Sequence, residues 1–205
     1  MILSIRRVIS IRYAQIRSLD LSNGEGIGVA LFVQGCRFRC PNCFNPETWD
    51  FNGGKEWTSE IQDKLIELAS RPYIKRLSIL GGEPLAKENL DDVLDLVNRI
   101  RLSCHQKTIW LYTGYEFENI FQEYYNGEYV GYPYYDKSYP SKSTLKRQDI
   151  IRQCNVLVDG RYIDSQRDIT LPYRGSKNQR LINIQKTLQQ REIVLYCEEI
   201  KKVGD

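Results

Sequence analysis

The 205-residue sequence contains one histidine, and no apolar run in it approaches the length of a membrane-spanning helix. A transmembrane helix needs about 20 predominantly apolar residues, so we expect no membrane association. The amino-terminal stretch also lacks a secretory apolar core, because Arg6, Arg7 and Arg12 interrupt it. We therefore expect a cytoplasmic protein, in a compartment that keeps thiols reduced.

A strong excess of charge is also lacking. Lysine and arginine number 29 against 26 aspartate and glutamate residues, a net charge of +3. That balance does not indicate a polyanion-binding protein, and we expect no nucleic-acid partner. The single histidine, His105, forms no convincing Ser/His/Asp set and is expected on the surface. The length and a 41% hydrophobic content suit one globular domain, taken as residues 1–205.

Apolar runs of strand length alternate with amphipathic segments of helix length. Strands are expected at 28–35, 76–84, 108–114, 154–160 and 191–197, and helices at 58–72, 88–102 and 116–125. This order is typical of parallel βαβ units and predicts an α/β fold. Because ligands bind at the carboxyl ends of parallel strands, four loops should converge on one mouth: the cysteine-rich segment, "GGEP", "YTGY" and "VDGR".

Three of the six cysteines lie within eight residues, at Cys36, Cys40 and Cys43 in "VQGCRFRCPNCFNPETW". Thiolates this close repel one another unless a cation holds them. A structural zinc site usually takes four ligands, commonly as two pairs, and a disulfide would leave one cysteine over. The spacing favours an iron–sulfur cluster with three protein ligands and one open iron. A zinc-binding interaction module is the alternative.

The remaining cysteines are scattered along the chain, and none is paired at ligand spacing. They lie at Cys104, Cys154 and Cys197. We expect buried thiols at these positions rather than a second cluster.

A glycine pair in "SILGGEPL" follows a run that reads as a buried strand. Gly81 and Gly82 would allow a ligand to approach the backbone closely, and Glu83 adds a carboxylate. Carbonyl and carboxylate oxygens are acceptors only, which suits a ligand with an ammonium group. An isolated Gly-Gly would be an ordinary turn, and the nearby cysteine segment favours the binding interpretation.

Together, Cys36-x3-Cys40-x2-Cys43 and "GGEP" resemble the radical S-adenosylmethionine (SAM) superfamily. Five further motifs occur in the order found in one of its families: "NGEGIGVALFVQGC", "CPNCFNPETWDF", "IWLYTGY", "VLVDGRY" and "YRGSKNQRLIN". They resemble the activating proteins of anaerobic ribonucleoside-triphosphate reductase, a glycyl-radical enzyme. The resemblance spans residues 12–184 apart from one insert.

The resemblance implies an incomplete parallel (β/α) barrel of the radical SAM type, with a [4Fe-4S] cluster on the three cysteines and S-adenosyl-L-methionine on the fourth iron. One electron from a low-potential donor would cleave S-adenosylmethionine to methionine and a 5′-deoxyadenosyl radical. That radical would take a hydrogen atom from a glycine of the reductase large subunit. The alternatives within the superfamily act on a small molecule or on a different glycyl-radical enzyme.

The resemblance also implies roles for individual residues. Contacts to the nucleoside part of S-adenosylmethionine are expected from Asn42, Cys43 and Phe44. Contacts to its amino group are expected from Gly81, Gly82 and Glu83. Two further candidates lie in family-like motifs, Asp159 and Arg174, and Asp159 is placed to bind a ribose hydroxyl.

Two segments fall outside the resemblance. One is an amino-terminal extension, residues 1–11, read as an arm or an extra strand. The other is an insert at residues 122–147, which holds seven of the fourteen tyrosines. The insert reads either as a loop with little helical order or as a surface for docking a protein. Trp49 and Trp57 are further candidates for contact with the reductase.

Overall fold

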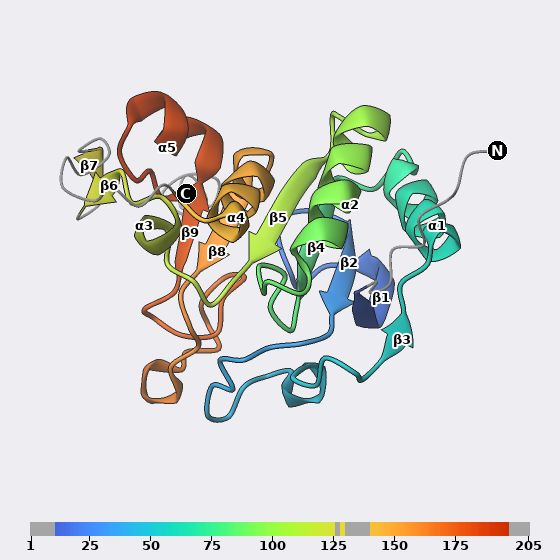
Figure 1. The fold of residues 1–205 in the computed structure, drawn as a ribbon, viewed down its shortest axis with the longest axis horizontal. Coiled ribbons are helices and arrows are strands. Elements are labelled where there is room, and N and C mark those ends of the chain that lie inside the picture. The colour runs from blue at the N-terminus through green and yellow to red at the C-terminus, as the bar shows by residue number, and fades with distance from the viewer. Residues whose placement is uncertain (1–10, 126–127, 130–139, 197–205) are drawn as a thin grey trace.

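The computed structural model describes residues 11–125, 128–129 and 140–196. Its main feature is a seven-stranded sheet in the order β3-β1-β2-β4-β5-β8-β9 (Figure 1). The four central strands are parallel: β2 (Gly28–Val33), β4 (Arg76–Gly81), β5 (Thr108–Tyr112) and β8 (Val156–Asp159). These strands confirm the α/β expectation and four of the five predicted strand positions.

The edge strands are antiparallel, which corrects the expectation of a purely parallel sheet. On one side β1 (Arg12–Asp20) pairs with both β2 and β3 (Lys55–Glu56). On the other side β9 (Arg180–Asn183) pairs with β8. In place of the expected parallel barrel, the structure has a mixed, partly parallel sheet.

The prediction of a strand at 191–197 is wrong for residues 191–196, the part of that range that the structure describes. They form only isolated bridges, at Glu192 and Leu195. The chain instead enters helix α5 (Ile184–Gln190) directly after β9. Arg191 then adopts a left-handed conformation, with φ of 59°, which turns the chain out of regular structure.

Helices α1 (Ser59–Ser70), α2 (Leu90–Ser103) and α4 (Lys142–Arg152) pack along one face of the sheet (Figure 1). Thr58 begins α1 as predicted, since its hydroxyl accepts a hydrogen bond from the Ile61 amide at 3.3 Å. Apolar residues of the helices and alternate strand residues form one continuous core between the layers. The other face of the sheet is left to loops.

No helix within the described ranges is both long and apolar enough to cross a membrane.

The insert is partly helical, which corrects its interpretation as a loop. The short helix α3 (Phe117–Ile120) precedes a two-stranded ribbon of β6 (Tyr124–Tyr125) and β7 (Glu128–Tyr129). Residues 142–147 form the first half of α4, because the Ser141 hydroxyl caps it at the Thr144 amide, 3.1 Å away. Residues 126–127 and 130–139 of the insert lie outside the described residues, as do residues 1–10.

Two short 3-10 turns, at Pro46–Thr48 and Asp164–Gln166, complete the regular structure. They lie in the loops that follow β2 and β8.

A fully buried arginine fixes the connection between β1 and β2. Arg76 donates to the Asp20 carboxylate at 2.7 Å, to the Asp20 carbonyl at 2.9 Å and to the Ser78 hydroxyl at 2.7 Å. Ser78 in turn donates to the Asn23 carbonyl at 2.5 Å. A Cβ atom on Gly28 would lie 2.4 Å from the guanidinium, so glycine is needed there. These bonds hold residues 20–28 against the sheet face that carries no helix.

We expect Arg76→Met to lower the free energy of unfolding by about 3–5 kcal/mol, because the buried Asp20 carboxylate then keeps only the exposed Arg17, at 3.8 Å, as a cation. The double variant Arg76→Met, Asp20→Asn removes both charges and should recover most of that loss. Urea unfolding of the three proteins tests this. A single variant within about 1 kcal/mol of wild type would contradict it.

Candidate functional site

The clustered cysteines lie on the loop that leaves β2, here called the cysteine loop (residues 36–49). Main-chain hydrogen bonds close it at its base, from Gly35 N to Thr48 O at 2.8 Å and from Cys36 N to Trp49 O at 3.0 Å. Cys36, Cys40 and Cys43 all carry free thiols and are partly exposed. The closed base keeps three accessible sulfurs on one short segment.

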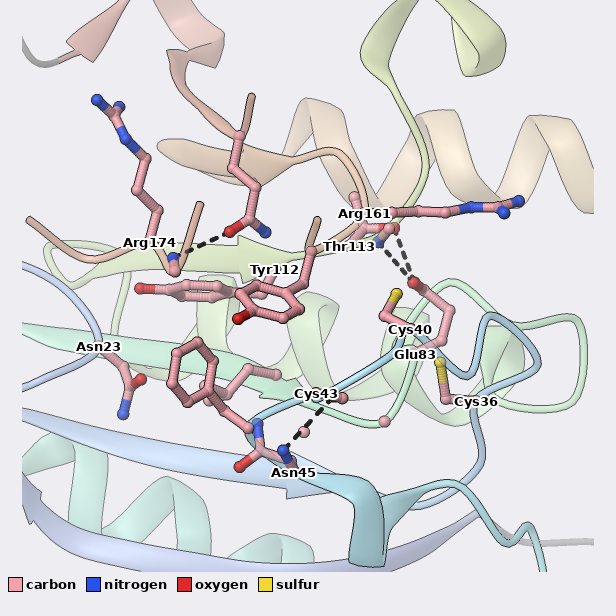
Figure 2. Close-up of a pocket in the computed structure, with 18 of the residues that line it drawn as sticks. Asn23, Cys36, Cys40, Cys43, Asn45, Glu83, Tyr112, Thr113, Arg161 and Arg174 are labelled. Carbon is pink, nitrogen blue, oxygen red and sulfur yellow. Dashed lines mark hydrogen bonds between the residues drawn. The ribbon is translucent and has the colours of Figure 1, made fainter. Parts of the chain in front are cut away.

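A cavity of about 460 Å³ lies at the carboxyl ends of the parallel strands, on the sheet face opposite the helices. The loops after β2, β4, β5 and β8 all contribute to its wall, which confirms the predicted convergence. Most of the predicted site residues line it: Cys36, Cys40, Cys43, Phe44, Gly81, Gly82, Glu83 and Arg174. Figure 2 shows Cys36, Cys40 and Glu83 toward one end and Asn23 and Arg174 toward the other.

The glycine pair packs directly against the cysteine loop. Gly82 N donates to Val33 O and Glu83 N donates to Gly35 O, both at 2.8 Å. A Cβ atom on Gly82 would lie 2.7 Å from Gly35 O, and Gly81 has φ of 103°, so both positions need glycine. The turn and the cysteine loop therefore form one continuous backbone surface.

The Glu83 carboxylate is buried and hydrogen-bonded to the loop after β5. Its Oε1 accepts from the Thr113 hydroxyl at 2.8 Å and from Leu85 N at 2.9 Å, and its Oε2 accepts from Gly114 N at 2.8 Å. Burial outweighs these bonds and raises the pKa of Glu83 to about 7. A carboxylate has roughly four acceptor sites, so one remains on Oε2 for a ligand.

Two predicted contact residues do not line the cavity. Asn42 is exposed and donates to Asp164 at 2.8 Å. Asp159 is 1% exposed and accepts from Arg180 Nε at 3.0 Å and from Phe117 N at 2.9 Å. Burial raises the pKa of Asp159, and Arg180 opposes that shift. Both remain predictions as ligand contacts, and the structure gives Asp159 an ion pair instead.

Sequence reasoning assigned no individual role to several residues that line the cavity. They include Asn23, Tyr112, Thr113, Gly114, Arg161, Tyr162, Gly175 and Gln179. All of them lie in or beside the family-like motifs quoted above, and those motifs are the sequence signal that could have identified them as site residues. Gln179, for example, joins two parts of the loop after β8. It accepts a hydrogen bond from Gly175 N at 2.9 Å and donates one to Gly160 O at 3.0 Å.

The prediction that Trp57 is a surface contact is wrong. Trp57 is 4% exposed, packs edge-on against Tyr13 and donates to Gln62 at 3.1 Å. Trp49 is partly exposed at the cavity wall, and its contact with a partner stays a prediction.

The scattered cysteines behave as expected where the structure describes them. Cys104 and Cys154 are buried, and His105 is exposed. Cys197 lies outside the described residues.

The arrangement of the three thiols bears on the kind of metal centre. Within the described ranges, no group of three or more His, Cys, Asp or Glu side chains is arranged to hold a metal ion. Three ligands of one zinc ion must converge on a point, since each Zn–S bond is about 2.3 Å long. A four-iron cluster instead takes one thiolate on each of three irons, so its ligands surround a larger object. Three thiols on one loop supply ligands for either kind of centre, and the family model described next distinguishes between them.

Comparison with known proteins agrees with this donor set. Residues 22–182 match a family model described as a 4Fe-4S single cluster domain. A protein of Salmonella typhi is 35% identical over 170 residues, which is 82% of this chain and 96% of the relative. A protein of Vibrio cholerae is 37% identical over 169 residues, 82% of this chain and 94% of the relative. A protein of Enterobacteria phage T4 is 32% identical over 169 residues, 82% of this chain and 92% of the relative.

All three are anaerobic ribonucleoside-triphosphate reductase-activating proteins. This chain belongs to that family. Membership confirms the resemblance seen in the motifs and supports an iron–sulfur cofactor. The range matched by the 4Fe-4S domain contains the three cysteines and every cavity-lining residue except Arg17.

We expect iodoacetamide at about pH 8 to modify Cys36, Cys40 and Cys43 of the iron-free protein much faster than Cys154. The thiolate is the reactive form, and burial raises the pKa of Cys154 to about 12. Burial also raises the pKa of Cys36 and Cys40, yet both stay partly exposed. Peptide mass spectrometry after timed alkylation measures each site. The control is urea-unfolded protein, in which every cysteine should react. Equal alkylation rates at Cys40 and Cys154 in the folded protein would contradict the prediction.

We expect the free energy of unfolding to fall as the pH rises from about 5 to 8. The pKa of Glu83 rises from 4.5 in an unfolded chain to about 7 in the fold, so the folded state binds more protons in that window. The stability that protonated Glu83 contributes below pH 4.5, its pKa in the unfolded chain, is therefore lost as Glu83 ionises in the fold. The loss is about 3 kcal/mol.

Urea unfolding of wild type and Glu83→Gln across this pH range isolates the Glu83 contribution. Glu83→Gln should lose most of the pH-dependent fall. Glu88→Gln, at an exposed neighbouring position, should keep it. The same pH profile for wild type and Glu83→Gln would rule this explanation out.

Proposed function

We propose that this protein reductively cleaves S-adenosyl-L-methionine at a [4Fe-4S] cluster and so generates a glycyl radical on the large subunit of anaerobic ribonucleoside-triphosphate reductase. The observation that carries the proposal is one cavity that joins three free cysteines to the Gly81–Glu83 turn in a member of the activating-protein family. The proposal includes a cytoplasmic location and a low-potential electron donor. It also interprets the sheet as a reduced form of the radical SAM barrel.

The donor set fits a cluster with one open iron. Cys36, Cys40 and Cys43 would each hold one iron, and no fourth cysteine lines the cavity within the part of the chain that the structure describes. The bound cluster and S-adenosylmethionine supply the one-electron chemistry that breaks a carbon–sulfur bond and removes a hydrogen atom from glycine. The protein's share is to bind, orient and exclude water.

The Gly81–Glu83 turn suits the amino group of S-adenosylmethionine. Gly82 has no side chain where Thr48 of the cysteine loop approaches, and Gly81 has none against Phe32 of β2, so the main chain of the turn can lie close to a ligand. Glu83 adds the acceptor site that its three internal hydrogen bonds leave open. An ammonium group has three donors and no acceptor, and it matches a site built from oxygen acceptors.

Phe44 is placed to contact the nucleoside. It follows the last cysteine, lines the cavity and is 53% exposed. Tyr162 packs edge-on against it at 5.1 Å between ring centroids, and Gly175 lies so close that a Cβ atom there would be 2.5 Å from the Phe44 ring. Tyr162 and Gly175 therefore hold the ring in place, and its exposed part can contact the nucleoside.

The floor of the cavity is largely apolar. Phe32 and Leu80, on the sheet face opposite the helices, contribute to it together with the ring of Tyr112. Apolar walls exclude water and so limit side reactions of a reactive species. No side chain has to act as a general base, because the proposed reaction transfers a hydrogen atom.

Anaerobic reconstitution with iron and sulfide, followed by reduction with dithionite and addition of S-adenosylmethionine, tests the proposal. We expect wild type to release 5′-deoxyadenosine, and Cys40→Ala to release none above background. Cys104→Ala, which removes a buried thiol distant from the cavity, should retain the reaction. A glycyl-radical signal in electron paramagnetic resonance should appear only when the reductase large subunit is added.

A protein that binds its cluster but never cleaves S-adenosylmethionine would refute the proposed function. Cleavage without a glycyl radical on the reductase would refute only the choice of substrate.

A further inference from the structure

The net charge of the protein is concentrated around the cavity. The cysteine loop and the loop of residues 160–179 together contain six cations and three carboxylates. Their excess of three positive charges equals the net charge of +3 for the whole chain, so the remaining residues balance. The cations are Arg37, Arg39, Arg161, Arg167, Arg174 and Lys177. We call the four exposed arginines among them, Arg37, Arg39, Arg161 and Arg167, the arginine rim.

The carboxylates on the 160–179 loop are used within the protein. Asp164 accepts from the Tyr162 hydroxyl at 2.7 Å and from Asn42 at 2.8 Å. Asp168 accepts from Thr170 N at 3.0 Å, and it also pairs with Lys177. These two carboxylates stabilise the loops. Of the rim arginines, Arg37 pairs with the Glu88 carboxylate outside both loops.

Three of the rim arginines, Arg37, Arg161 and Arg167, stack on aromatic rings of the cysteine loop or beside it. The guanidinium of Arg161 lies 4.4 Å from the centre of the Phe38 ring, and that of Arg167 lies 5.5 Å from the Phe44 ring. Within the described ranges, neither arginine forms an ion pair with a carboxylate. Stacking orients a guanidinium and leaves its N–H groups free to bind carboxylates in pairs. In Figure 2 the Arg161 side chain extends above Cys40 and Glu83.

Exposed apolar side chains accompany the rim. Ile169 is 78% exposed and Phe44 is 53% exposed, and both line the cavity. Ile163, on the same loop, is 38% exposed. Aromatic residues and arginine are enriched at protein interfaces, where an apolar centre is ringed by polar groups. The surface around the cavity therefore has the composition of a protein-binding site.

We propose that the arginine rim docks the protein that delivers its glycine to the cavity, and that this partner presents an acidic surface around its glycine-bearing segment. The inference rests on the proposed function. A glycine must reach the cavity, so its protein has to lie on the residues that surround the opening. Complementary charge then steers the encounter and fixes its orientation.

The test reverses two rim charges whose side chains do not line the cavity, in the double variant Arg37→Glu, Arg39→Glu. The control makes the same charge change on the helical face, at Lys64 of α1 and Arg99 of α2. Binding to the large subunit of the organism's own anaerobic reductase is measured at about 50 and 200 mM salt. Release of 5′-deoxyadenosine with dithionite and no reductase is measured in parallel.

We expect the rim variant to bind the reductase at least about tenfold more weakly at low salt and to lose most of the salt dependence of wild type. The control should bind as wild type does. Both variants should release 5′-deoxyadenosine without reductase at the wild-type rate, because none of the four changed side chains lines the cavity.

Unchanged affinity and salt dependence in the rim variant would overturn the proposal. The proposal would also be overturned if the rim variant bound the reductase normally but its cluster were reduced slowly by an acidic ferredoxin. That result would assign the rim to the electron donor. Failure of wild type to release 5′-deoxyadenosine would refute the proposed function instead. The binding measurement needs no turnover and would still decide on the rim.

Discussion

Two main-chain hydrogen bonds, from Gly82 N to Val33 O and from Glu83 N to Gly35 O, hold the candidate site together. They continue the parallel ladder of β2 and β4 beyond the ends of both strands. Because parallel neighbours end at the same edge of a sheet, bonds of 2.8 Å are enough to join the cysteine loop to the glycine turn. The Glu83 carboxylate then extends the connection to Gly114, after β5. Three loops are thereby fixed by one chain of contacts that any side chain on Gly82 would disrupt.

The fourth loop is held differently, because its strand pairs antiparallel with the next one. Residues 160–179 leave β8 and return to β9, so both ends of the loop lie at one point of the sheet. Arg180 secures that point by bonding Asp159 at 3.0 Å and Glu118 at 2.9 and 2.7 Å. Gln179 bridges the main chain of the two ends. Anchored ends with an exposed middle, where Ile169 lies, give a loop that walls the cavity and still faces solvent.

The parts of the fold that local sequence determines were predictable. β2, β4, β5 and β8 are short apolar runs, and the cysteine spacing and the glycine pair need no distant partner to be noticed. β1 was missed because four of its nine residues are exposed and three of those are polar, and β9 because it has only four residues before a helix. Trp57 was misplaced since its burial depends on Tyr13, far away in the sequence. Gln179 acquires its function only through hydrogen bonds that the fold creates.

The sheet face that carries no helix differs between its two ends. At the amino ends of the parallel strands, the buried pair of Arg76 and Asp20 closes the face by pinning residues 20–28 to it. A buried ion pair adds little net stability, because desolvation offsets its attraction, so its value here is to fix that loop. At the carboxyl ends, loops alone surround the cavity, and four of their arginines are exposed. A site closed at one end and bordered by free charge at the other suits a reactant carried on the surface of another protein.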